Sequence, residues 1–282
     1  MKRITAIVLS LLMCFAFTAC DTDKADAGEL QTYIFDVGKG DCILIRTKNT
    51  VTMIDTGYSS TAHDVKERLR SMNILSIDNM IITHYDKDHL GGAVKIMKDF
   101  RVDKVYLPSY ESTSSRYEEF MQAIYQQELE TERVSNKVSF TADSAVFSIS
   151  ASGCEYVTGT GGDEGNDNDM SLVISVENGS DSYLFAGDIE DEAIENYLSR
   201  EGKHYDVLKI PHHGEMCDNT QLLLDAVAPK IAVITDGKGD KMDKKLKNLL
   251  ESKSITYYSS KNNGDITIKS SGKGEYEAET EE

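Results

Sequence analysis

Potential metal ligands crowd into one short segment of this chain, directly after an apolar run. The run Met80-Ile81-Ile82-Thr83 has the pattern of a buried strand, and the next six residues contain two histidines and two aspartates. They are His84, Asp86, Asp88 and His89. Imidazole offers a borderline nitrogen donor and carboxylate a hard oxygen donor, so the mixture suits zinc or manganese better than an ion that seeks thiolates. The pattern predicts a fold that ends a core strand in a metal-binding loop.

Two other strand ends carry residues of the same kind. The adjacent His212 and His213 follow an apolar run at 207–210, and Asp188 follows another at 183–186. A solvated polar turn would explain the aspartates, but four of the six histidines of the chain lie in these segments. Asp188 has a competing interpretation as a helix cap, since a helical pattern begins at Glu190. We favour the interpretation that the three segments form one metal site.

Strand and helix patterns alternate along the rest of the chain. Strands are predicted at 32–36, 42–46, 51–55, 80–83, 102–107, 145–149, 170–176, 183–185, 207–210 and 231–235, and near Thr256 and Ile266. Helices are predicted at 62–72, 93–98, 117–129, 190–199, 221–226 and 241–252. The first three strands are separated by short turns and should form an antiparallel sheet. This alternation indicates α/β layers, with sheets sandwiched by helices in one domain spanning 30–270.

These motifs together resemble the metallo-β-lactamase superfamily, and within it the ComEC-like metallo-hydrolases. The resemblance rests on the His84 to His89 loop with Asp86 in place of the second signature histidine, and on further segments in the same order: Asp36-Val37-Gly38-Lys39-Gly40-Asp41, Ile54-Asp55-Thr56-Gly57, Asn168-Asp169-Met170-Ser171-Leu172-Val173, Gly187-Asp188 and Pro211-His212-His213-Gly214. It implies a four-layer αβ/βα sandwich.

The resemblance also implies a site with two divalent metal ions, Zn or Mn. His84 and Asp86 would hold one ion, Asp88, His89 and one of the His212/His213 pair would hold the second, and Asp188 would bridge them. The sequence leaves open which histidine of the pair is the ligand. The separate third-motif histidine of the superfamily is replaced by the segment around Asn168 and Ser171. The first ion would therefore be weakly held, or water would complete its coordination, and the number of bound ions stays open.

Catalytic roles follow from this assignment. Two cations would activate a bridging water to a hydroxide, Asp88 would orient it or take its proton, and the histidine of the pair that is not a ligand would donate to a substrate oxygen. Asp36, Asp41 and Asp55 are predicted to support the ligand loops by hydrogen bonds, with turn formation an equally good explanation.

The ComEC-like resemblance makes a phosphodiesterase or nuclease the leading hypothesis, with DNA or another phosphodiester as the substrate. The net charge of −18 is poorly suited to nonspecific binding of phosphates, although metals in a cleft would supply a local positive field. Two alternatives are a β-lactam or other ester hydrolase, and a binding module that uses the same fold without turnover. Six convergent metal-binding groups argue against the binding module.

The N-terminal region reads as an export signal. Lys2 and Arg3 precede an apolar stretch at 4–17, and the run Phe17-Thr18-Ala19-Cys20 resembles the lipobox of bacterial lipoproteins. We expect residues 1–20 to be a lipoprotein signal with Cys20 as the lipidated residue, or an ordinary signal cut nearby. In either case the protein is expected outside the cytoplasm, attached to the membrane by a lipid anchor or secreted.

The two ends of the expected domain are polar. Residues 21–29 are predicted to be a flexible tether and 271–282 a flexible acidic tail. No apolar run long enough for a transmembrane channel follows the signal. The three cysteines beyond Cys20 are an odd number, so no disulfide framework is expected.

Overall fold

The computed structural model describes residues 28–157, 166–238 and 242–281. Its strands are β1 Leu30–Ile34, β2 Ile43–Arg46, β3 Val51–Ile54, β4 Ser76–Ile81, β5 Arg101–Pro108, β6 Glu130–Val134, β7 Lys137–Ala142, β8 Ala145–Ser150, β9 Val173–Asn178, β10 Asp181–Phe185, β11 Val207–Lys209, β12 Ile231–Ile234, β13 Thr256–Ser259, β14 Ile266–Ser270 and β15 Tyr276–Thr280. Its helices are α1 Ala62–Ser71, α2 Ala93–Asp99, α3 Ser115–Gln126, α4 Asp191–Glu201, α5 Thr220–Val227, α6 Lys244–Ser252 and α7 Ser260–Asn263, with the 3₁₀ turns η1 Asn168–Met170 and η2 Pro211–Gly214.

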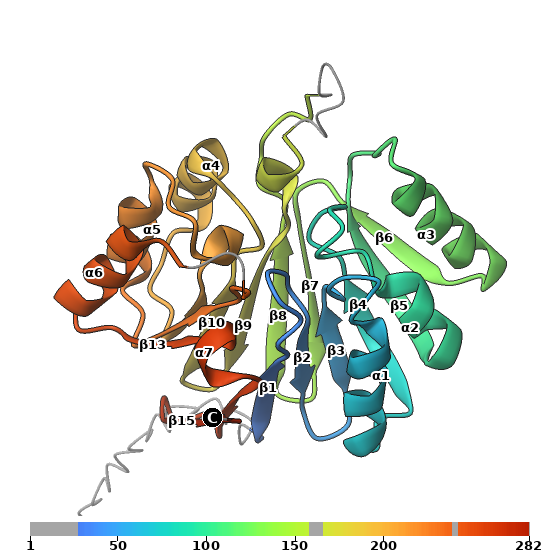
Figure 1. Ribbon diagram of the computed structural model, residues 1–282, viewed down its shortest axis with the longest axis horizontal. Helices are drawn as coiled ribbons and strands as arrows, with labels where there is room; N and C mark the ends of the chain where they lie inside the picture. Colours follow the sequence, from blue (N-terminus) through green and yellow to red (C-terminus); the bar gives the residue numbers. More distant parts are fainter. Residues whose placement is uncertain (1–27, 158–165, 239–241, 282) are drawn as a thin grey trace, which may run out of the picture.

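Two mixed sheets form the centre of the molecule (Figure 1). The first has eight strands in the order β15-β14-β1-β2-β3-β4-β5-β6, and the second has seven in the order β13-β12-β11-β10-β9-β8-β7. The first three strands pair antiparallel, as predicted. From β3 to β6 the first sheet is parallel, and so is the second from β10 to β13.

Three hydrophobic cores separate four layers. One core joins the first sheet to α1, α2 and α3, and includes Val65 and Leu69 on the predicted apolar face of α1. A second lies between the sheets and includes Phe147 and Tyr183. The third joins the second sheet to α4, α5 and α6. Figure 1 shows the two helical layers on opposite sides of the paired sheets, so the predicted four-layer αβ/βα sandwich is confirmed.

Three strands were not predicted from the sequence. β6 and β7 are edge strands whose exposed residues are polar or charged, so they lack the apolar runs on which strand prediction depends. The prediction of a flexible tail at 271–282 was wrong for β15, which pairs with β14 along its whole length. The buried carboxylate of Asp181 accepts from the backbone N–H groups of Gly272 and Gly274 and holds the connecting turn. A long-range contact of this kind leaves no local pattern in the sequence.

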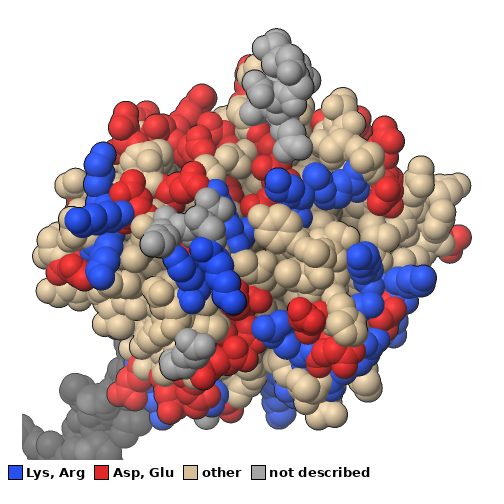
Figure 2. Space-filling view, in the orientation of Figure 1, with Lys and Arg blue, Asp and Glu red and all other residues tan. Residues whose placement is uncertain are grey.

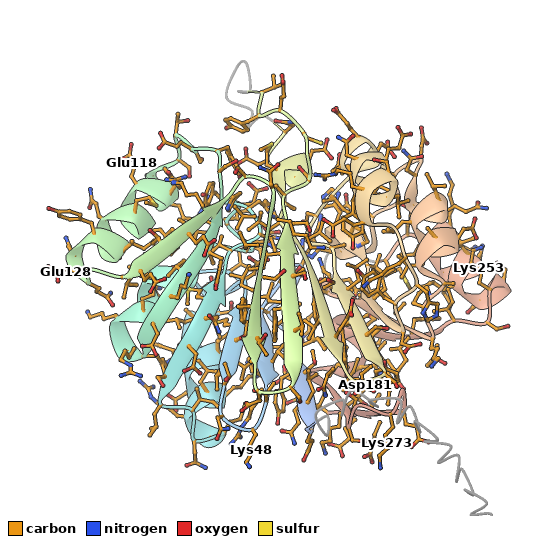
Figure 3. The ribbon with its side chains drawn as sticks, turned by 180° about the vertical axis from the view of Figure 1, so that it is seen from behind. Lys48, Glu118, Glu128, Asp181, Lys253 and Lys273 are labelled. Atoms are coloured by element: carbon orange, nitrogen blue, oxygen red, sulfur yellow. The ribbon has the colours of Figure 1, made fainter. Side chains whose placement is uncertain are left out.

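The orientation of β10 fixes the end of the molecule at which the site lies. Figure 3 labels Asp181, the first residue of β10, at the lower end of the sheet beside Lys273, so β10 runs away from this end. Lys48, in the turn before β3, is labelled at the same lower end. The carboxyl ends of β3 and β10 therefore both lie at the opposite end.

The predicted signal and Cys20 lie outside the described residues, and export and lipidation stay predictions. Among the described residues, Cys42, Cys154 and Cys217 have free thiols. Within the described ranges, no helix has the length and apolar character needed to cross a bilayer.

Candidate metal centre

The predicted ligand residues meet at the carboxyl ends of strands from both sheets. His84 and His89 lie on the loop after β4, Asp188 follows β10, and His213 lies in η2 after β11. All four are buried. Because parallel strands end at the same edge of a sheet, residues about 100 positions apart come within hydrogen-bond distance of one another.

Three imidazole rings are held in the same way. Each uses Nδ1 to contact a supporting side chain: His89 to Asp55 at 2.8 Å, His213 to the Thr235 hydroxyl at 3.1 Å, and His84 to the Ser171 hydroxyl at 3.2 Å. In His89 and His213 the Nε2 atoms then face each other at 3.3 Å. Fixing one ring nitrogen to orient the other is the usual way in which proteins aim histidine at a metal.

Carboxylates complete the cluster. Asp188 Oδ2 lies 2.9 Å from His213 Nε2 and 3.1 Å from His89 Nε2. Asp88 Oδ2 lies 3.5 Å from His213 Nε2, and Asp86 Oδ2 lies 3.8 Å from His84 Nε2. The side chains of Asp88 and Asp86 are 15% and 26% exposed, whereas Asp188 is 4% exposed. The cluster is thus closed on the Asp188 side and open to solvent on the side of the ligand loop.

The donor set fits one or more divalent cations. His84, His89 and Asp188 have ligand atoms within 4.8 Å of one another, and so do Asp88, His89 and His213. His84 Nε2 is fully buried and has no hydrogen-bond partner among the described residues, although a buried polar atom normally has one. An ion beside this nitrogen would satisfy it.

The competing interpretation of Asp188 as a helix cap is not supported. Helix α4 begins after Glu190, and Asp188 directs one oxygen to the histidines and the other to Lys209 Nζ at 3.3 Å.

The structure also separates the adjacent histidines. Both have left-handed backbone conformations, with φ of 49° for His212 and 53° for His213, which turns their side chains to different sides. His213 joins the cluster, whereas His212 Nδ1 contacts Glu190 Oε1 at 3.0 Å. Of the two histidines that the sequence left as alternatives, His213 therefore lies in the cluster and His212 lies outside it.

The remaining predicted support residues have different outcomes. Asp55 contacts His89, and Asp41 accepts from Thr235, which holds His213. Asp36 instead accepts from the backbone N–H of Gly38 in its own turn, so its predicted role at the ligand loops was wrong and the turn explanation is correct. Asn168 donates to Glu190 at 3.0 Å and thus lies on the His212 side.

Sequence reasoning missed Lys209, whose side chain is 1% exposed beneath the cluster. Its Nζ contacts Asp41 Oδ2 at 2.5 Å, Asp188 Oδ1 at 3.3 Å and the carbonyl of Gly187 at 2.9 Å. The signal was a lysine inside an otherwise apolar strand, because a charged residue in such a place is seldom left without a partner.

Electrostatic interactions act in opposite directions on the proposed ligands. Burial lowers the pKa of His89 and of His213, but the carboxylate of Asp188 outweighs it and raises both, so these imidazoles release a proton when a cation binds. Burial opposes charge on Asp88, but the hydrogen bond with His213 and the charge of His89 outweigh it and lower the pKa of Asp88 to about 2. Burial lowers the pKa of His84, and the neighbouring His89 lowers it further. At neutral pH an ionised Asp88 and a neutral His84 therefore line the cluster, as metal coordination requires.

Comparison with known proteins identifies the family. Residues 35–235 match the metallo-beta-lactamase superfamily. The chain belongs to this superfamily. ComE operon protein 3 of Bacillus subtilis is 26% identical to it over 262 residues, which are 85% of this chain and 33% of that protein. Recombination protein 2 of Haemophilus influenzae is 26% identical over 241 residues, which are 81% of this chain and 26% of that protein. Competence protein ComA of Neisseria gonorrhoeae is 23% identical over 231 residues, which are 81% of this chain and 30% of that protein. The chain thus spans about a third or less of these relatives, and the resemblance to the ComEC-like proteins is confirmed.

Solved structures agree with this assignment. Zn²⁺-bound PqqB from Methylobacterium extorquens superposes with a TM-score of 0.53 at 8% identity, covering 84% of this chain and 99% of that one. At this identity the likeness shows the metallo-β-lactamase fold alone. Together with the histidine and aspartate cluster, the family indicates a centre for divalent metal ions.

Proposed function

We propose that this protein is a metal-dependent hydrolase that cleaves phosphodiesters, with DNA as the leading substrate. The observation that carries the proposal is the convergence of His84, His89, His213 and Asp188 at a buried point, with Asp88 at its open side. A site that only binds a partner has no need of this donor set.

The metal ligands follow from the contacts. His89, His213, Asp88 and Asp188 would hold one cation, and His84 with Asp86 would hold a second with fewer protein donors. Zn or Mn suits these nitrogen and oxygen atoms. When bound, the cations supply Lewis acidity toward a substrate oxygen and a water molecule.

The protein's own groups supply proton transfer and orientation. The partly exposed Asp88 takes the proton of the attacking water at Oδ2, because it is an ionised carboxylate that lies between His213 and solvent. His212, with its side chain 23% exposed, lies at the rim, where it donates to a phosphoryl or leaving-group oxygen. Glu190 holds His212 Nδ1 and so positions the ring for this contact.

A phosphodiester is favoured over other esters for two reasons. Hard carboxylate donors such as Asp86 suit the oxophilic cations of phosphoryl chemistry. The name of the Haemophilus influenzae relative, Recombination protein 2, also points to nucleic acid. The proposed location is outside the cytoplasm, where the predicted signal and Cys20 anchor would place the enzyme.

The decisive experiment uses the protein from residue 21 onward, loaded with Mn or Zn. It is incubated with single-stranded DNA, double-stranded DNA, bis-p-nitrophenyl phosphate and the β-lactam nitrocefin. We expect hydrolysis of the phosphodiesters, its loss with a chelator, and no turnover of nitrocefin. Nitrocefin turnover without phosphodiester cleavage would establish the β-lactam alternative instead.

The two adjacent histidines should differ sharply in their effect on metal affinity. We expect His213→Ala to lower the metal affinity by more than about 100-fold. The loss of a residue that only hydrogen-bonds to a metal ligand lowers the affinity by about 10- to 100-fold. His212→Ala should change it by less than about 3-fold, because its ring faces Glu190. Titration of the metal-free variants with zinc against a chromophoric chelator measures both values. Equal losses in the two variants would contradict the assignment of His213.

A further inference from the structure

A pocket opens beside the ligand loop. Its volume is about 340 Å³, and three segments form it: residues 58–60 before α1, Lys87 and Gly91 of the ligand loop, and the first turn of α3. The polar groups that face it are Ser59, Ser60, Lys87, Ser115, Arg116 and Glu119. Hydroxyl groups and two cations thus dominate its lining.

The two cations of the pocket are not held in salt bridges with carboxylates of the described residues. Neither Lys87 nor Arg116 forms an ion pair within the described ranges, although the chain carries a net charge of −18. Arg116 is held in place, since its Nη1 donates to the carbonyl of Tyr85 on the ligand loop at 3.1 Å. This contact uses one of its five N–H donors, and a planar guanidinium is well suited to phosphate oxygens.

The start of α3 adds to the positive potential. Ser115 and Arg116 are the first two residues of this 12-residue helix, and the preceding Ser114 caps it by accepting from the N–H of Tyr117. The N–H groups of the first turn carry partial positive charge and favour anions. Glu119, one turn along, is the single carboxylate in the pocket lining.

The pocket adjoins the ligand loop of the metal centre. Lys87 stands between Asp86 and Asp88 in the chain, and Tyr58 lines the pocket on the other side. Gly40 shows how close the two regions are: a Cβ atom at this position would lie 3.0 Å from Asp88 Cβ and 3.3 Å from the Tyr58 ring. Tyr58, which lines the pocket, and Asp88, at the open edge of the cluster, therefore lie around the same point.

We propose that this pocket binds the phosphate next to the scissile phosphate in a polynucleotide strand. The inference rests on the proposed phosphodiesterase function and names its substrate as a polymer rather than a small diester. On the face that Figure 2 draws, basic side chains lie in small groups among acidic ones. We therefore expect a local pair of cations, rather than a broad basic surface, to hold the strand. Contacts to the backbone phosphates position a strand without selecting its sequence.

The test compares a polymer with a substrate that has one phosphate. The variant Lys87→Ala/Arg116→Ala is assayed with a single-stranded oligonucleotide and with bis-p-nitrophenyl phosphate. We expect KM for the oligonucleotide to rise by about 10-fold or more, whereas kcat/KM for the small diester falls by no more than about 3-fold. The slope of log(kcat/KM) against log salt should decrease by about 0.7, the value for one phosphate on a single strand.

Two further variants make the result specific. Arg46→Ala/Lys48→Ala removes one arginine and one lysine from the opposite end of the molecule, where Figure 3 labels Lys48. It should change KM for the oligonucleotide and kcat/KM for the small diester by less than about 2-fold. Glu119→Gln removes the carboxylate of the pocket and should lower KM for the oligonucleotide a few-fold. Equal effects on both substrates, or an equal loss in the Arg46/Lys48 variant, would overturn the inference.

Binding measured without turnover separates this inference from the proposed reaction. Fluorescence anisotropy with a labelled oligonucleotide should give an about 10-fold weaker Kd for the Lys87/Arg116 variant than for the unmodified chain. If neither phosphodiester is hydrolysed, the proposed function fails, but this difference in Kd still supports the pocket. Equal Kd values, or no binding by the unmodified chain, would refute the pocket as a phosphate site.

Discussion

Asp88→Asn should lower kcat/KM for a phosphodiester by about 1,000-fold, within the range of 10²- to 10⁴-fold typical for the loss of a general base. The amide keeps the shape of the carboxylate but cannot take a proton from water. Asp88 is the ionised carboxylate that contacts His213 and also reaches solvent, so no neighbouring group of the cluster has the same position. Steady-state kinetics and the metal content of the same preparation provide the measurement.

The control for this variant is Asp99→Asn, which removes a surface carboxylate paired with Lys66 and Arg70 at the end of α2. The kcat/KM of this variant should stay within about 2-fold of the value for the unmodified protein. Asp88→Asn also tests the alternative of a binding module, because a protein that acts by binding would retain its partner without turnover. Full hydrolytic activity in a metal-loaded Asp88→Asn protein would rule out the role assigned to this residue.

Lys209→Met should lower the free energy of unfolding by about 3 to 5 kcal/mol, the range for removing one partner of a buried ion pair. Methionine fills a similar volume, but Asp41 and Asp188 would then lie close together in the interior without their shared cation. A loss of this size corresponds to a decrease in Tm of about 6 to 20 °C for a domain of this length. Thermal and urea unfolding of the metal-free protein measure the change.

Two comparisons assign the loss to charge rather than to packing. Lys203→Met removes a lysine from an exposed ion pair with Glu177 and should cost less than about 1 kcal/mol. Adding Asp41→Asn to Lys209→Met should recover part of the stability, because it removes one of the carboxylates left unpaired. A metal-free Lys209→Met protein as stable as the original would show that Lys209 does not balance these charges.

The sequence predicted the layers of this protein because each has a local pattern. Apolar runs identified the buried strands, and the spacing of Val65 and Leu69 identified the inner face of α1. The edge strands β6, β7 and β15 were missed because one or both faces of each meet solvent. Their positions depend on pairing with neighbouring strands, and β15 also depends on Asp181, about 90 residues away.

For the site, the sequence by itself determined which residue types are available and that they follow strand ends. It placed His84, Asp86, Asp88, His89 and Asp188 at the candidate site, and it left two adjacent histidines as alternatives for one further position. The choice of His213 required the left-handed backbone of both residues, and the role of Lys209 required the approach of Asp41 from another loop. The donor atoms of a side chain follow from its residue type and can therefore be identified in the sequence. Distances and burial depend on contacts between segments far apart in the chain, and only the folded structure brings these segments together.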